Sequence, residues 1–222
     1  MTKPIGILLL LFAWTTAAAY EYDPDIGEEI NEECAGCHSE FGQGGKGGEY
    51  PRIAGQPVDY LIRQLHLFQN RERPNLPMVE HVDQRQLPEE DMFQIAQYLN
   101  RIELKTKLPP VDDKAPGFDA YARLLESKQI MQVPRAPGNF EKGRRLYRRE
   151  CAICHGREGW GREKKGVPML AGQYTSYLWR QVKKFRNRIR LHDEDEPDDE
   201  LLDDFTDEEL RDIFAYLSIV DD

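Results

Sequence analysis

Two short stretches of the sequence each combine two cysteines with a histidine. They read CAGCH at residues 34–38 and CAICH at residues 151–155, and they hold all four cysteines of the 222-residue chain. Two thiols three positions apart can form thioether bonds with the two vinyl groups of one haem, and the next residue places an imidazole beneath the iron. We therefore expect His38 and His155 to be proximal iron ligands. Two haems c would be attached covalently through the cysteines, Cys34, Cys37, Cys151 and Cys154.

Other uses of a Cys-x-x-Cys pair fit the sequence less well. A thioredoxin-like redox pair belongs among alternating strands and helices, and no such alternation surrounds either motif. A zinc site would need both motifs to converge on one metal ion, because structural zinc takes four ligands. One motif is a modest indication of haem attachment, and two in matching surroundings are a strong one.

The surroundings of the two motifs are repeated. A shift of 117 positions, which carries Cys34 onto Cys151, aligns the chain without a gap as far as Asn70 and Asn187. The shift pairs Pro51 with Pro168, and it superimposes the Ala-Gly-Gln run of residues 54–56 on that of residues 171–173. A period of this length is too long for a solenoid unit. It indicates a duplicated domain.

Both copies show the same order of expected helices. A helix leads into the motif, a glycine-rich loop and the Ala-Gly-Gln run follow, and two more helices complete the unit, at 58–71 and 88–102 or at 175–188 and 206–220. We expect Asn139 to cap the helix before the second motif, and Thr206 with Glu209 to form a capping box. Apolar residues share one helical face in each last helix, and no segment is a convincing strand. The fold class expected is all-α.

The expected division of the chain is a signal peptide at 1–19, domains at 20–102 and 139–222, and a linker at 103–138. The linker is proline-rich at both ends, and residues 118–131 within it favour one helix. It is long for a plain connection. We expect it to pack across the domain interface, either as an ordered arm without a special role or as a partner-binding element.

The start of the chain has the layout of an export signal. Lys3 precedes an apolar run of about ten residues, which is too short to span a bilayer comfortably, and small residues follow up to Ala19. We expect cleavage near Ala19 and a periplasmic protein. The formal net charge of -10 makes nucleic-acid binding a poor prospect. Residues 141–192 are strongly basic and residues 193–209 strongly acidic, which favours compensation within the second domain.

On these residues the chain resembles the dihaem cytochrome c4 family. The resemblance rests on the paired motifs, on PRIAGQ and PMLAGQ with the following Tyr-Leu and Arg-Gln pairs, and on the endings LPEEDMFQIAQYL and FTDEELRDIFAYL. It covers most of residues 25–102 and 139–220. It implies an exported electron carrier built from two class I cytochrome c domains. It also implies a histidine and a methionine as the axial ligands of each haem.

The first copy offers a methionine at the expected place. A distal ligand should lie between the middle and last helices, where Met78 stands beside a proline and His81 follows three residues later. Met78 is the better match to the family pattern and is the expected distal ligand of the first haem. Met92 lies within the last helix and is expected in the core.

The second copy departs from the family pattern, because its distal loop contains no methionine. Alignment of the last helices places Glu196 opposite Met78, and Met169 pairs with Arg52 beside the proximal proline, where a packing role is expected. His192 is the one histidine of this loop. Two outcomes stay open: ligation by His192, giving a bis-histidine haem, or a vacant or water-filled position. A carboxylate ligand is a minor third option.

Two functions follow from these alternatives. The first is an exported dihaem cytochrome that passes single electrons between a quinol-oxidising complex or periplasmic dehydrogenase and a terminal oxidase or reductase. Peripheral association with a membrane is compatible with this role. The second is a dihaem redox enzyme or enzyme subunit, for example in sulfur-compound oxidation or peroxide reduction, in which the second haem is unusual or open. The sixth ligand distinguishes them, because it decides whether iron only passes electrons or also binds substrate.

Overall fold

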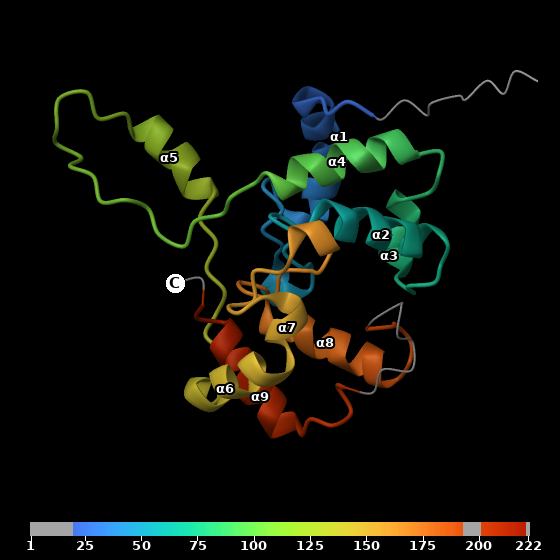
Figure 1. The fold of residues 1–222 in the computed structure, drawn as a ribbon. Coiled ribbons are helices and arrows are strands. Elements are labelled where there is room, and N and C mark those ends of the chain that lie inside the picture. The colour runs from blue at the N-terminus through green and yellow to red at the C-terminus, as the bar shows by residue number, and fades with distance from the viewer. Residues whose placement is uncertain (1–19, 193–200, 221–222) are drawn as a thin grey trace, which may run out of the picture.

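The computed structural model describes residues 20–192 and 201–220, and each regular element in these ranges is a helix. Three isolated β-bridges are the extended pairings found there. Figure 1 shows a group of helices from each half of the chain and a long connection that projects to one side. The all-α class is thus confirmed. The predicted signal segment at 1–19 and Glu196 lie outside the described residues.

The first half of the chain folds around one apolar core. Its helices are α1 (Pro24–His38), the 3-10 turn η1 (Lys46–Gly48), α2 (Val58–Gln69), α3 (Leu76–His81) and α4 (Glu89–Asn100). Asp23 is the N-cap of α1, and its side chain accepts a hydrogen bond from the backbone N–H of Asp25. Met92 and Ile95 of α4 are fully buried in the core, against Leu61 of α2.

The second half repeats this plan with one interruption. Its helices are α6 (Phe140–Glu150), α7 (Ala152–His155), the 3-10 turn η2 (Glu163–Lys165), α8 (Thr175–Arg186) and α9 (Asp207–Leu217). Asn139 caps α6, and Thr206 forms a capping box with Glu209 at the start of α9, as predicted. α6 ends at Glu150 and Cys151 separates it from α7, so the second motif forms a short helix of its own, whereas the first motif closes α1.

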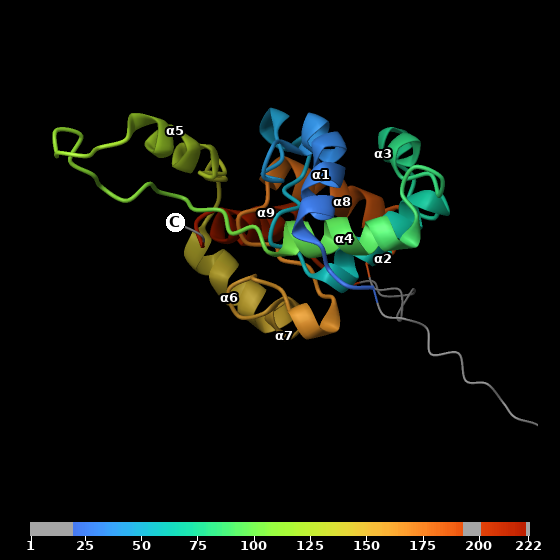
Figure 2. The same ribbon diagram turned by 90° about the horizontal axis from the view of Figure 1, so that it is seen from above.

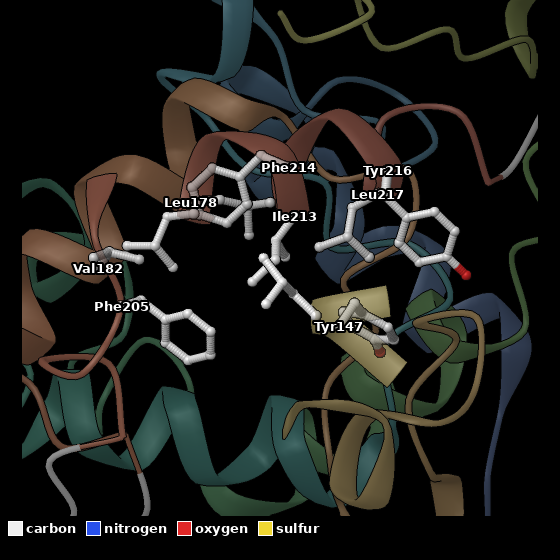
Figure 3. Packing of buried hydrophobic residues seen from close by; sticks show 10 residues of the cluster. Tyr147, Leu178, Val182, Phe205, Ile213, Phe214, Tyr216 and Leu217 are labelled. Carbon is white, nitrogen blue, oxygen red and sulfur yellow. The ribbon is translucent and has the colours of Figure 1, made fainter. Parts of the chain in front are cut away.

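The first and last helices of each half pack against one another, α1 with α4 and α6 with α9. Figure 3 shows the core of the second half, in which Tyr147 of α6 lies beside Leu217 and Tyr216 of α9. The close approach of the two helices requires a glycine in α6. A Cβ atom added to Gly143 would lie 1.8 Å from the carbonyl oxygen of Asp212.

The connection between the halves is a partly helical arm. Its helix, α5 (Ala120–Lys128), is shorter at both ends than the expected 118–131, and it buries no side chain. In Figures 1 and 2 the arm projects away from both halves. Its two ends are tied together, because the backbone N–H of Met131 donates to the carbonyl of Lys105 at 2.9 Å. Lys128, the last residue of α5, contacts the first half, because it pairs with Glu40 at 3.0 Å and its carbonyl accepts from Gln43 at 2.6 Å. Beyond α5, buried Met131 lines a small cavity with Arg52 and Trp160.

Candidate haem sites

Both Cys-x-x-Cys-His motifs line one continuous cavity of about 1730 Å³. Apolar side chains of α2 and α4 face it from the first half, and those of α8 and α9 face it from the second. A pocket for one drug-sized ligand measures about 300–1,000 Å³. The cavity is therefore large enough for two large planar groups, one beside each motif.

The four cysteines are unpaired thiols, and three of them are half-buried. Burial raises the pKa of Cys34 to about 11 and that of Cys151 to about 12. A redox-active cysteine pair depends on a lowered thiol pKa, and these thiols show the opposite shift. Within residues 20–192 and 201–220, no three His, Cys, Asp or Glu side chains gather into a metal cluster.

Each motif histidine is held by a proline carbonyl thirteen residues later. The Nδ1 atoms of His38 and His155 each lie 2.9 Å from the carbonyl oxygen of Pro51 or Pro168. Because a carbonyl can only accept, Nδ1 carries the proton and Nε2 keeps its lone pair for a metal. Burial lowers the pKa of His38, and it lowers that of His155 to about 4. Both imidazoles are therefore neutral, as ligands must be, at neutral pH.

Met78 lies in the short helix α3. Its side chain is half-buried, packs against that core and lines the cavity. His81, the alternative, is the last residue of α3 and is exposed, although it also lines the cavity. Met92 is 1% exposed and sits in the core, as expected.

His192 faces the proximal histidine of the second half. The ring centroids of His155 and His192 are 6.2 Å apart, with 41° between the ring planes. Two imidazoles that bind one metal ion from opposite sides at about 2.0–2.1 Å would have centroids about 6.3 Å apart, if each ring nitrogen lies about 1.1 Å from its centroid. His192 is exposed, and Phe185 packs edge-on against it at 5.3 Å. The distance between the imidazoles matches one shared metal ion.

Met169 has the packing role that was expected. It is 5% exposed, and its backbone bonds with Gln56 of the first half through both its N–H and its carbonyl.

Two buried arginines that the sequence reasoning missed lie in the same cavity. Arg73 and Arg190 are 7% and 9% exposed, and both line the cavity. Arg73 donates to the hydroxyl of Tyr177 at 2.9 Å, and Arg190 donates to that of Tyr60 at 3.1 Å. Each arginine thus reaches into the opposite half. The shift of 117 positions pairs Arg73 with Arg190, so the repeat was the signal that could have found them.

The arginines supply what the carboxylates of a haem require. Their hydrogen bonds within the described residues go to neutral amides and hydroxyls, and the Nε of Arg190 is buried without a partner there. A buried cation is costly unless it is paired. Guanidinium groups bind carboxylates well, and each haem carries two propionates. Thiols, neutral imidazoles, apolar faces and buried cations therefore all fit the group that the motifs predict.

Known proteins share this fold and these motifs. The cytochrome c family model matches residues 140–221. Cytochrome c4 of Stutzerimonas stutzeri is 26% identical over 203 residues, which cover 88% of this chain and 87% of that protein. The crystal structure of reduced recombinant cytochrome c4 from Pseudomonas stutzeri matches with a TM-score of 0.61 at 19% identity, over 89% of this chain and 98% of the other. These similarities support the cytochrome c4 family.

The same comparisons support a c-type cytochrome, an electron carrier with covalently bound haem c, and the fold matches the two-domain fold of cytochrome c4. A second kind of relative is the thiosulfate dehydrogenase electron acceptor of Thiomonas intermedia. It is 28% identical over 160 residues, which cover 72% of this chain and 65% of that protein. Across the residues that the structure describes, the helices fall short of the length and apolar character that a membrane span requires.

Proposed function

We propose that this cytochrome carries two haems and passes single electrons between redox proteins of the periplasm. Cys34 with Cys37, and Cys151 with Cys154, would hold the haems covalently. His38 and His155 would be the proximal ligands. The haem supplies reversible one-electron chemistry at its iron. The protein supplies orientation, burial and charge compensation, the last from Arg73 and Arg190.

The distal ligands proposed are Met78 in the first half and His192 in the second. The observation that carries the proposal is the separation of 6.2 Å between the rings of His155 and His192. Imidazoles on both sides would leave no position free for a substrate. A site closed in this way supports electron transfer without substrate chemistry. Replacement of methionine by histidine as axial ligand lowers the haem potential, because methionine raises it. The second haem would then have the lower potential.

The division of the chain remains part of the proposal. Residues 1–19 would be a signal peptide cleaved near Ala19, residues 20–102 and 139–222 would be domains that arose by duplication, and residues 103–138 would be the linker. Two cores, one in each half of the chain, support this division.

The partners proposed are redox proteins. One group of relatives is named as the electron acceptor of thiosulfate dehydrogenase, which supports a periplasmic dehydrogenase as electron donor. A quinol-oxidising complex as donor, and a terminal oxidase or reductase as acceptor, are the other candidates. The same relatives favour one alternative, a redox subunit dedicated to an enzyme of sulfur-compound oxidation.

Carbon monoxide binding tests the proposal. The haem-loaded protein should contain two haems by pyridine haemochrome assay, and after reduction neither should bind carbon monoxide readily. His192→Ala should open the second site to carbon monoxide. His81→Ala is the matched change at an exposed histidine of the first half. It should leave both reduced haems unable to bind carbon monoxide readily. Ready binding by one haem of the unaltered protein would instead favour the enzyme alternative.

A further inference from the structure

The peptide group after each proximal proline makes hydrogen bonds at both its ends. In the first half, the Pro51 carbonyl accepts from Nδ1 of His38 at 2.9 Å. The N–H of the same peptide group belongs to Arg52, and it donates to Oε1 of Gln173 at 3.0 Å. Gln173 is part of the second half. One peptide group thus links a proximal histidine to a side chain from the opposite half.

The second half contains the corresponding pair of hydrogen bonds, with the roles of the two halves exchanged. The Pro168 carbonyl accepts from Nδ1 of His155 at 2.9 Å, and the N–H of Met169, in the same peptide group, donates to Oε1 of Gln56 at 2.9 Å. Gln56 belongs to the first half. The two chains of hydrogen bonds therefore cross the interface in opposite directions.

Both glutamine amides are fixed in place. Gln173 also donates from Nε2 to the carbonyl of Arg52 at 2.9 Å, and Gln56 donates to the carbonyl of Met169 at 3.0 Å. A reversed amide would set donor against donor and acceptor against acceptor. Gln56 is 3% exposed and Gln173 is 4% exposed, so water does not compete for these bonds.

A peptide group transmits polarisation between its two ends. A hydrogen bond at its N–H draws charge towards its carbonyl oxygen, and neighbouring bonds strengthen one another by about 10–30% each. A stronger acceptor at Nδ1–H makes the imidazole a more basic ligand. A more basic ligand favours the oxidised, more positive iron and lowers its reduction potential.

We propose that Gln56 and Gln173 are positioning residues that act crosswise, each strengthening the proximal histidine of the opposite half. The proposal rests on the proposed proximal roles of His38 and His155, and it does not depend on the distal ligands. It makes the interface between the halves a part of both iron sites. The potential of each haem is then set partly by whether the two halves are docked.

Redox titration of two variants tests the proposal. Gln173→Met keeps the length of the side chain and removes both polar atoms, so the potential of the haem bound by His38 should rise while that of the other haem stays. Gln56→Met should raise the potential of the haem bound by His155 and leave that of the haem bound by His38 unchanged. Paramagnetic NMR of protein labelled with 15N-histidine distinguishes the haems, because His38 and His155 are assigned through the backbone.

Two controls separate tuning from a loosened interface. Gln173→Glu keeps an acceptor for the Arg52 N–H in either protonation state, so it should not raise the potential. Ser176→Ala removes a different hydrogen bond between the halves, to Gly47, and should shift neither haem. The crosswise role would be overturned if both haem potentials shifted equally or if neither shifted. It would also be overturned if the potential that shifted belonged to the haem in the substituted half. Absence of two haems, or of His38 and His155 from the iron atoms, would instead overturn the proposed function.

Discussion

Met78 and Met92 belong to neighbouring elements of the first half but have different surroundings. Met78 in α3 is half-buried and lines the cavity, whereas Met92 in α4 is 1% exposed and lies in the core. A thioether that coordinates iron needs access to the cavity, and one that fills the core needs contact on all sides. The two methionines therefore form a natural pair of test and control.

Alanine substitution should separate their roles. Met78→Ala should abolish the methionine–iron absorption band of the ferric protein and open the first site to carbon monoxide. Met92→Ala should keep that band and lower the free energy of unfolding by about 2–5 kcal/mol, because it leaves a cavity in the core. Absorption spectroscopy and denaturant titration measure the two effects. A band that survives in Met78→Ala would show that another side chain is the ligand.

The proximal residues could be named from the sequence because their chemistry is local. The cysteines and the histidine of each motif are set by one turn of chain, and the repeat indicated the proline loop that holds each imidazole. The distal side depends on where a loop returns to the cavity. The sequence therefore could not decide whether His192 binds the second iron or whether that position is vacant. The separation between the rings of His155 and His192 favours His192 as the ligand.

At the scale of elements, Gly143 fixes how α6 crosses α9. A Cβ atom there would lie 1.8 Å from a backbone oxygen, which cannot rotate away as a side chain can. Gly143→Ala should lower the free energy of unfolding by about 1–3 kcal/mol through overpacking. Gly36→Ala, where no atom lies within 4 Å of an added Cβ, should be neutral or slightly stabilising in its helix. Denaturant titration of the haem-loaded variants measures both, and equal effects would refute the steric account.

The long amphipathic helices were predictable, and the short elements were not. Asn139 and Thr206 marked the starts of α6 and α9 because capping depends on the residues nearby. α3 was expected to be loop, since Pro74 and Pro77 flank its start, yet a proline is accommodated in the first turn of a helix. The end of α6 at Glu150 agrees with the expected helix that leads into the second motif, whereas the separate short helix α7 within that motif was not expected.

At the scale of the whole molecule, several opposite charges of the second half form ion pairs among the residues that the structure describes. Arg186 at the end of α8 pairs with Asp207 of α9 at 2.8 Å, and Lys142 of α6 pairs with Glu208 of α9 at 3.5 Å. Exposed pairs of this kind contribute about 0–1 kcal/mol each.

The contacts between the halves were beyond sequence reasoning, because the repeat matched Gln56 with Gln173 but gave no sign that each reaches into the other domain.

The arm between the halves should be dispensable for the fold. The halves are joined directly by hydrogen bonds such as those of Gln56 and Gln173, while α5 buries no side chain and the ends of the arm are bonded to each other. Replacement of residues 107–128 by about twelve Gly and Ser residues, enough to reconnect the parallel bridge at its base, should keep both haem potentials and the melting temperature nearly unchanged.

A matched change at the base of the arm should behave differently. Met131 is 4% exposed, so Met131→Ala should cost about 2–5 kcal/mol in the free energy of unfolding.

If the arm serves partner recognition, its replacement should slow electron exchange with a donor protein while potentials and stability stay the same. A large loss of stability on replacing the arm would mean instead that it braces the two halves, contrary to the exposure of α5. Thermal denaturation, redox titration and stopped-flow kinetics on one set of proteins separate these outcomes.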